Sequence, residues 1–312
     1  MNPYGSAVDR LPVTDRDDER GRAGQRAGRP TSRRVLHRQA GPLESGSVVA
    51  GGLRIHAVWS AGPQAAGRPP LVLVHGLGVS GRYMLPVLVR LARQRRVYAP
   101  DLPGFGRSDK PAHAMTLREL ADALAAWMSA VGLRQSVLVG HSFGCQVIVD
   151  LCLRRPDLVE RMVLAAPTGD PRSRSALRHV WRLLLDAPRE PLSLIPLAAR
   201  DYLRAGVVRS ARTLRFSLAD RTEGKLPRVL VPALVMRGSR DPVVTARWAH
   251  EVACALPFGE LVTVEGAAHA VNYNSPSRFA RAVGRFLGGA SPAGRRPASE
   301  SIEHAIAGGV ER

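Results

Sequence analysis

The stretch 135–145, QSVLVGHSFGC, constrains the fold of this chain more than any other part of the sequence. Residues 137–139 form a continuous apolar run, which predicts a short strand buried on both faces. A helical pattern begins after Ser142, so residues 140–144 match G-x-S-x-G at a strand–turn–helix junction. Such a turn strains the backbone of the serine, and the two glycines let strand and helix pack closely. The pattern predicts that Ser142 is a nucleophile.

Strand-like apolar runs alternate with helical patterns along most of the chain, which predicts βαβ units and a mainly parallel sheet. A hairpin is expected over 47–59, around two adjacent glycines. Strands are expected at 71–74, 96–99, 137–139, 161–165, 233–237 and 261–264, and helices at 82–93, after Ser142, and at 244–256 and 276–287. A capping box at Thr116-Leu117-Arg118-Glu119 predicts a further helix that ends near Val131.

Residues 168–227 interrupt this alternation, because they show helical periods and no convincing strand. We interpret them as a helical cap inserted into a core made of 46–167 and 228–289, covering the carboxyl edge of the sheet. One amphipathic stripe in the insert consists of Leu177, Val180, Trp181, Leu184 and Leu185. The Arg-rich segment 1–45 is expected to be a disordered arm, 61–70 a linker and 290–312 a flexible tail.

A serine nucleophile needs a general base, and the base needs an acid to orient it. In this class of fold the order along the chain is serine, acid and histidine, each at the end of a strand. Asp241 follows the apolar run 233–237, and His269 follows the run 261–264. The sequence therefore predicts a catalytic triad of Ser142, Asp241 and His269.

The acid of this triad has one alternative in the sequence. Asp170 follows the earlier strand 161–165, and an acid from that strand could reach the same histidine. The sequence alone leaves this alternative open.

The same chemistry requires hydrogen-bond donors for a developing oxyanion. The backbone N–H of Phe143, the residue after the nucleophile, is one expected donor, and the N–H of Leu77 in the glycine-containing loop after strand 71–74 is the other. We interpret His75 and His141 as structural residues rather than catalytic ones.

Taken together, these motifs resemble the α/β-hydrolase superfamily over about 47–288. The resemblance implies a mostly parallel eight-stranded sheet with helices on both faces and an inserted cap, in the capped subgroup of esterases, carbon–carbon bond hydrolases and haloperoxidase-like enzymes. Serine at position 142 disfavours haloalkane dehalogenases and epoxide hydrolases, which place aspartate there. The motifs that carry the resemblance are His75-Gly76, Asp101-Leu102-Pro103-Gly104-Phe105-Gly106-Arg107-Ser108, Gly140–Gly144, Asp241 and His269.

The expected activity is that of a carboxylesterase-like serine hydrolase acting on a small to medium hydrophobic substrate, with no metal and no organic cofactor. Two alternatives stay open. An alcohol could replace water, which would make the protein an acyltransferase, or the scaffold could bind a ligand without turnover.

Composition narrows the class of partners. The net charge is +19, but 43 of the 45 basic residues are arginines spread along the chain, and aromatic residues make up only 5%. This distribution argues against a specific nucleic-acid partner and permits loose association with anionic surfaces at low salt. Eleven arginines against six acidic residues in 168–224 leave open an anionic substrate, a membrane surface or a merely solvated face.

The three cysteines, Cys145, Cys152 and Cys254, are too widely spaced for a metal site or a disulfide framework and fit a reducing compartment. No apolar run has the length of a membrane span. We therefore expect a soluble, cytoplasmic protein, and the sequence does not indicate an oligomeric state.

Overall fold

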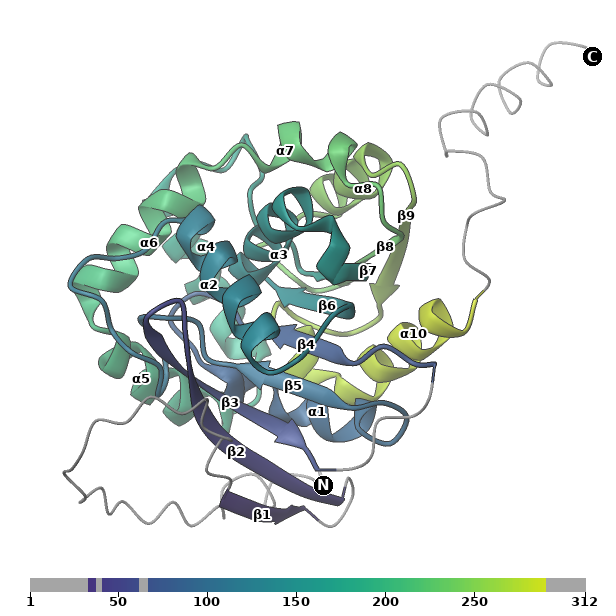
Figure 1. Ribbon diagram of the computed structural model, residues 1–312. Coiled ribbons are helices and arrows are strands. Elements are labelled where there is room, and N and C mark those ends of the chain that lie inside the picture. Colours follow the sequence, from purple (N-terminus) through teal and green to yellow (C-terminus); the bar gives the residue numbers. More distant parts are fainter. Residues whose placement is uncertain (1–32, 38–40, 62–66, 290–312) are drawn as a thin grey trace, which may run out of the picture.

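The computed structural model describes residues 33–37, 41–61 and 67–289 (Figure 1). Its central feature is one nine-stranded sheet with the order β1-β2-β3-β5-β4-β6-β7-β8-β9. Strands β2 to β9 form the mostly parallel eight-stranded sheet that the sequence predicts, and β1 adds an antiparallel strand at one edge. The strands are β1 (Arg33–His37), β2 (Gly41–Ala50), β3 (Leu53–Ser60), β4 (Leu71–Val74), β5 (Val97–Pro100), β6 (Ser136–His141), β7 (Val159–Ala165), β8 (Ala233–Gly238) and β9 (Gly259–Val264).

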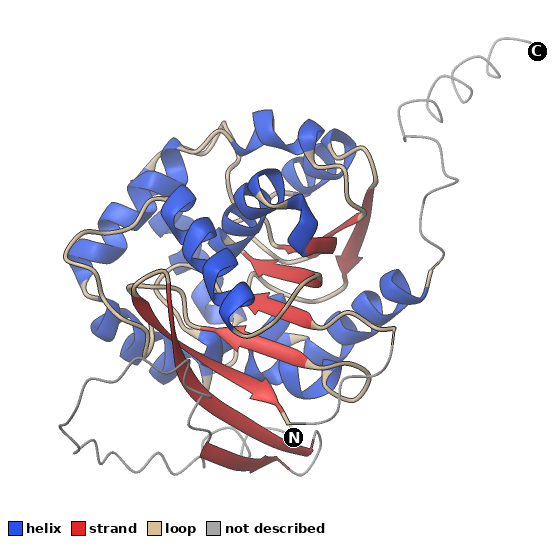
Figure 2. Cartoon of the chain, in the orientation of Figure 1, coloured by secondary structure: helices blue, strands red, loops and turns tan. Residues whose placement is uncertain are grey.

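Helices cover both faces of this sheet, as predicted (Figure 2). The helices are α1 (Leu85–Leu91), α2 (Leu117–Ala130), α3 (Phe143–Arg154), α4 (Ala176–Asp186), α5 (Leu194–Ala205), α6 (Val207–Ala219), α7 (Thr222–Lys225), α8 (Ala246–Ala255), α9 (Val271–Asn274) and α10 (Pro276–Gly288). Short 3₁₀ turns are η1 (Gly81–Met84), η2 (Pro156–Leu158), η3 (Ala187–Arg189) and η4 (Leu226–Arg228). The predicted capping box begins α2, where Thr116 accepts from the Glu119 amide and Glu119 accepts from the Thr116 amide.

Two apolar cores lie on opposite sides of the sheet, because successive side chains of a strand point to opposite faces. In β4, Val72 and Val74 belong to the core formed with α2, α3 and α8, whereas Leu71 and Leu73 belong to the core with α1, α9 and α10. Cys145 and Cys152 both lie in the first core, because residues seven apart on α3 share a face. Strands buried on both faces hold the loops at their carboxyl ends in fixed positions.

The boundaries of the expected N-terminal arm are wrong. Strand β1 and the first half of β2 lie within 1–45, which the sequence analysis assigned to disorder. Backbone pairing explains the difference: β1 adds to the edge strand β2 through an antiparallel register that needs little apolar burial. Residues 1–32, the middle of the predicted linker and the predicted tail 290–312 lie outside the described residues.

Residues between β7 and β8 form a run of helices, α4 to α7, which we call the helical insert (residues 168–227). Its three longer helices are α4, α5 and α6, in agreement with the helical periods of this segment. The arrowheads of β4, β5 and β6 point toward the side of the molecule on which α4, α5 and α6 lie (Figures 1 and 2). No helix in the described part of the chain has the length and apolar character needed to cross a membrane.

Candidate active site

Ser142 occupies the sharp turn between β6 and α3. Its backbone has φ 52° and ψ −117°, a conformation that non-glycine residues rarely adopt. The Ser142 amide donates to the carbonyl of Ala165 on the neighbouring strand β7, at 2.9 Å, which holds the turn against the sheet. Ser142 is only 8% exposed, so its hydroxyl is largely shielded from solvent.

The flanking glycines are required by contacts with backbone atoms. A Cβ on Gly140 would lie 2.7 Å from the amide of Cys145, and a Cβ on Gly144 would lie 2.4 Å from the carbonyl oxygen of Val74. Real side chains do not approach backbone atoms so closely. The close approach of α3 to β4 and β6 therefore depends on both glycines.

Asp241, His269 and Ser142 form a continuous hydrogen-bonded chain. Nδ1–H of His269 donates to Oδ2 of Asp241 at 3.0 Å, and Nε2 of the same ring lies 3.1 Å from Oγ of Ser142. The other carboxylate oxygen of Asp241 accepts from the amides of Val243 and Val244. All three side chains are buried, at 3%, 6% and 8% exposure. The sequence predicted this grouping, and the fold brings the three residues together from the ends of three strands.

Electrostatics favour a charged acid beside the histidine. Burial alone would raise the pKa of the Asp241 carboxyl, but the His269 ring and the two backbone amides outweigh burial and hold the pKa below its ordinary value. Burial likewise lowers the pKa of His269, but Asp241, followed by Asp186 and Glu190, outweighs it and raises the pKa. A buried imidazole between carboxylates is thus a stronger base than a free one.

The loop after β4 lies against the nucleophile. A Cβ on Gly76 would be 3.6 Å from Cβ of Ser142, which places the neighbouring Leu77 beside the serine. Among the described residues, neither the Leu77 amide nor the Phe143 amide has a protein acceptor. Both N–H groups are therefore available for an external acceptor, as expected for oxyanion donors.

The remaining histidines near the serine hold loops in place, as the sequence analysis interpreted them. His75 is fully buried, and its Nδ1–H donates to the Gly76 carbonyl while its Nε2 accepts from the Leu102 amide. His141 donates through Nε2 to the backbone carbonyl of His269 at 3.0 Å. Burial, followed by the charge of His269, lowers the pKa of His141 to about 3, so this ring stays neutral.

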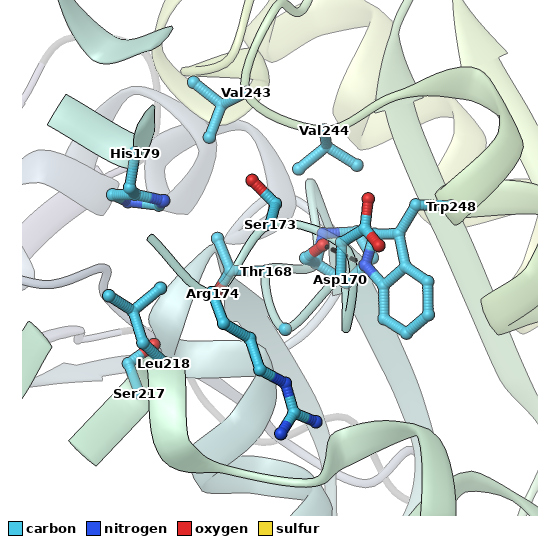
Figure 3. Close-up of a pocket in the computed structure, with 12 residues that line it drawn as sticks. Thr168, Asp170, Ser173, Arg174, His179, Ser217, Leu218, Val243, Val244 and Trp248 are labelled. Carbon is cyan, nitrogen blue, oxygen red and sulfur yellow. Dashed lines mark hydrogen bonds between the residues drawn. The ribbon is translucent and has the colours of Figure 1, made fainter. Parts of the chain in front are cut away.

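Asp170, the alternative acid, lies away from this chain of hydrogen bonds. Its carboxylate accepts from the Arg172 amide at 2.9 Å and lines a small pocket between the helical insert and α8 (Figure 3). Val243, Val244 and Trp248 form the core side of this pocket, and His179 of α4 lies across from them. The acid that reaches His269 is Asp241.

Two carboxylates that the sequence analysis missed contact the loop that carries His269. Oδ1 of Asp186, the last residue of α4, accepts from the His269 amide at 3.1 Å. Glu190 accepts from the Ala270 amide at 2.7 Å and from the side-chain amide of Asn274. Burial raises the pKa of both carboxyls, that of Glu190 to about 7. No sequence motif marks them, since their significance lies in contacts with a loop about 80 residues away.

The helical insert is attached to the core at two further points. Oγ of Ser80 donates to Asp201 of α5 at 2.5 Å, and the ring of Tyr202 lies so close to Gly78 that a Cβ there would overlap it. On the other side, the buried side chain of Gln146 in α3 bonds Ser217 of α6 and Thr222 of α7. Within the described residues, no group of three His, Cys, Asp or Glu side chains is arranged to hold a metal ion.

Comparison with known proteins agrees with this architecture. The model of the alpha/beta hydrolase family matches residues 71–282, and the chain belongs to that family. A relative from Pseudomonas syringae pv. syringae, named "Putative carbamate hydrolase", is 30% identical over 247 residues, covering 72% of this chain and 95% of the relative. The 2-hydroxymuconate semialdehyde hydrolase of Pseudomonas sp. CF600 is 28% identical, over 72% of this chain and 88% of its own length.

A solved structure shows the same fold. The enol-lactonase from Burkholderia xenovorans LB400 superposes with a TM-score of 0.67 at 24% identity, over 78% of this chain and 100% of the enol-lactonase.

Proposed function

We propose that this protein is a carboxylesterase-like serine hydrolase that cleaves an ester or related acyl bond of a small to medium hydrophobic substrate. The observation that carries the proposal is the hydrogen-bonded chain from Asp241 through His269 to the strained Ser142. The name of the carbamate hydrolase relative supports it, because a carbamate also contains an acyl carbon bound to a heteroatom.

In the proposed mechanism, Oγ of Ser142 attacks the acyl carbon while Nε2 of His269 takes the hydroxyl proton. The Leu77 and Phe143 amides bind the oxyanion that forms. His269 then gives the proton to the departing alcohol, and an acyl-enzyme remains on Ser142. A water molecule, deprotonated by His269, attacks this ester, and the acid leaves as Ser142 regains its proton. Asp241 keeps the ring oriented and stabilises its charged form throughout.

We further propose that the helical insert acts as a cap over this site. Its carboxylates Asp186 and Glu190 contact the His269 loop, and its Asp201 and Tyr202 contact the loop that contains Leu77. Both loops that would handle the substrate therefore touch the cap. Exclusion of water by such a cover strengthens the hydrogen bonds within the site.

Covalent labelling tests the nucleophile directly. A fluorophosphonate probe should label the purified protein, and Ser142→Ala should abolish both labelling and hydrolysis of p-nitrophenyl esters. Ser136→Ala, which removes another buried hydroxyl from β6, the strand that precedes Ser142, should leave both unchanged. Undiminished hydrolysis in Ser142→Ala would contradict the proposal.

The substrate class is tested with a panel. Rates with p-nitrophenyl esters of graded chain length, an aryl carbamate and a lactone should show a preference for acyl-type bonds with apolar groups. If the probe labels the protein but the protein hydrolyses none of these compounds, the proposed substrate class is rejected.

A further inference from the structure

Helix α4 carries its apolar side chains on the outside of the molecule. Leu177 and Trp181 keep 81% and 59% of their surface exposed, although the sequence pattern of α4 is that of a helix that buries one stripe. The full stripe consists of Leu177, Val180, Trp181, Leu184 and Leu185. An exposed stripe of this kind marks a contact surface more often than a free one.

The opposite side of α4 faces the core and the candidate active site. Asp186 follows Leu177 by nine residues, about two and a half helical turns, so the two side chains point in opposite directions. Asp186 binds the His269 amide, and Arg182 donates to Ser173 and to the Val243 carbonyl. The apolar stripe therefore faces away from the catalytic residues and does not line their site.

Exposed apolar residues concentrate on this part of the molecule. Eleven of the fourteen large apolar side chains that are exposed in the described residues lie within 177–208, and only Val49, Leu230 and Leu261 lie elsewhere. Helices α5 and α6 and the turn before α5 contribute side chains that are more than half exposed, namely Leu192, Ile195, Leu203, Val207 and Val208. Helices α4, α5 and α6 lie on the same side of the molecule (Figure 1).

These helices carry an excess of positive charge, and their carboxylates are directed to the core. Residues 176–219 contain eight arginines and three carboxylates. The three carboxylates, Asp186, Glu190 and Asp201, all accept hydrogen bonds from core residues. None of the eight arginines forms an ion pair with a carboxylate of the described chain. Arg182 and Arg209 donate to backbone carbonyls of the core. The exposed arginines within 176–219 are Arg178, Arg189, Arg204, Arg212 and Arg215, so the outward side is both apolar and cationic.

We propose that the outward side of α4, α5 and α6 docks this protein on an anionic lipid bilayer, with the stripe of α4 in the interfacial region. Leucines and a tryptophan beside unpaired arginines are the combination that lies at the boundary between acyl chains and anionic head groups. A second copy of this chain is disfavoured as the partner, because a self-complementary contact would bring two cationic faces together. The proposal goes beyond the hydrolase activity and does not depend on it.

Docking would bring the candidate active site close to the membrane. Asp186 ends the same helix whose outer stripe would enter the interface, and it binds the His269 amide. The loop carrying His269 would then lie one helix diameter from the head groups, about 10 Å.

Vesicle binding by the full chain tests the proposal. The protein should co-sediment with phosphatidylcholine vesicles that contain phosphatidylglycerol, much less with phosphatidylcholine alone, and less as salt rises. Trp181 provides a spectroscopic reporter, because Trp59, Trp127 and Trp248 are only 7%, 1% and 3% exposed. Its emission should shift to shorter wavelength on binding, and Trp181→Phe should abolish the shift while sedimentation persists.

Matched substitutions locate the surface. Leu177→Gln combined with Leu184→Gln should weaken binding at least about tenfold, because two large side chains lose their burial in lipid. Leu230→Gln, at a side chain 72% exposed and outside the helical insert, should bind like the parent. Melting temperatures should be unchanged in both, since all three positions are exposed.

Three results would overturn the proposal. The first is no sedimentation with anionic vesicles. The second is binding that the double substitution leaves unchanged, which would assign it to basic residues elsewhere. The third is concentration-dependent self-association, or capture of an acidic protein, that requires Leu177 and Leu184 while vesicles are not bound.

Discussion

At the scale of single residues, the site depends on a backbone turn that tolerates no extra atom. Gly144→Ala would push a methyl group against the carbonyl oxygens of Val74 and His75, which belong to the buried strand β4 and the loop that follows it. Since backbone cannot move aside as a flexible side chain can, we expect a loss of about 2–3 kcal/mol in the free energy of unfolding, together with a loss of probe labelling.

Urea denaturation of Gly144→Ala measures this loss. Gly224→Ala is the control, because a Cβ there meets nothing within 4 Å. It should leave both stability and labelling near those of the parent. Equal stability of the two variants would show that the turn can relax, contrary to the packing argument.

The pKa of His269, the proposed base, is also determined at this scale, by the charges around the ring. Only the neutral imidazole can take the serine proton, so kcat/KM should fall as the pH drops through the pKa of His269. Asp241, Asp186 and Glu190 raise that pKa, which moves the fall to a higher pH than for an ordinary histidine. Glu190→Gln keeps an acceptor for the Ala270 amide but removes a negative charge, so the fall should move to lower pH.

A pH–rate profile with a p-nitrophenyl ester measures this shift. Glu260→Gln makes the same change at an exposed position at the start of β9, far from the carboxyl end of that strand. Its profile should match that of the parent. A profile for Glu190→Gln that shows only a lower plateau, with the midpoint unmoved, would leave Glu190 a structural role alone.

At the scale of secondary-structure elements, one buried amide joins the helical insert to the core. Gln146 is fully buried in α3, and its side chain bonds the Ser217 carbonyl and the hydroxyls of Ser217 and Thr222. Gln146→Leu would leave these groups without partners, which should cost about 2–4 kcal/mol. Chemical denaturation measures the loss, and Gln94→Leu, the same change at an exposed position, should cost little. Similar costs for the two would contradict the role of Gln146.

The order of elements was predictable because each has a local signal. Strand β6 contains the continuous apolar run 137–139, α2 has its capping box, and Asp241 and His269 each follow a strand with an apolar run. Since parallel strands end at one edge of a sheet, the grouping of these two residues with Ser142 follows from the fold. Their catalytic roles, and those of Leu77 and Phe143, stay predictions.

The contacts of Asp186 and Glu190 had no such signal. A carboxylate that binds a loop amide far along the chain leaves no periodic trace in the sequence. The direction of the α4 stripe could not be predicted either. The spacing shows that Leu177, Trp181 and Leu184 share a face of the helix, but it does not show whether that face meets the core or solvent.

At the scale of the whole molecule, burial of neutral histidines links stability to pH. Burial, followed by the charges of His269 and Arg182, lowers the pKa of His179 to about 4 in the folded protein. The unfolded chain binds a proton at this residue below about pH 6.5, whereas the folded chain does not. Because the unfolded state then holds more protons, His179 removes stability as the pH falls from about 6.5 to about 4.

His179→Gln should cancel this loss. The quantity to compare is the free energy of unfolding of the variant minus that of the parent. This difference should rise by up to about 1.4 kcal/mol for each unit by which the pH falls from about 6.5 to 4, and it should be constant above pH 7. Urea midpoints at several pH values measure the difference. Comparing the two proteins at each pH cancels the self-repulsion of a chain with net charge +19, which both share. The slope should also persist at high salt, because it arises from desolvation of one ring. A difference independent of pH would mean that His179 takes up its proton while the protein stays folded.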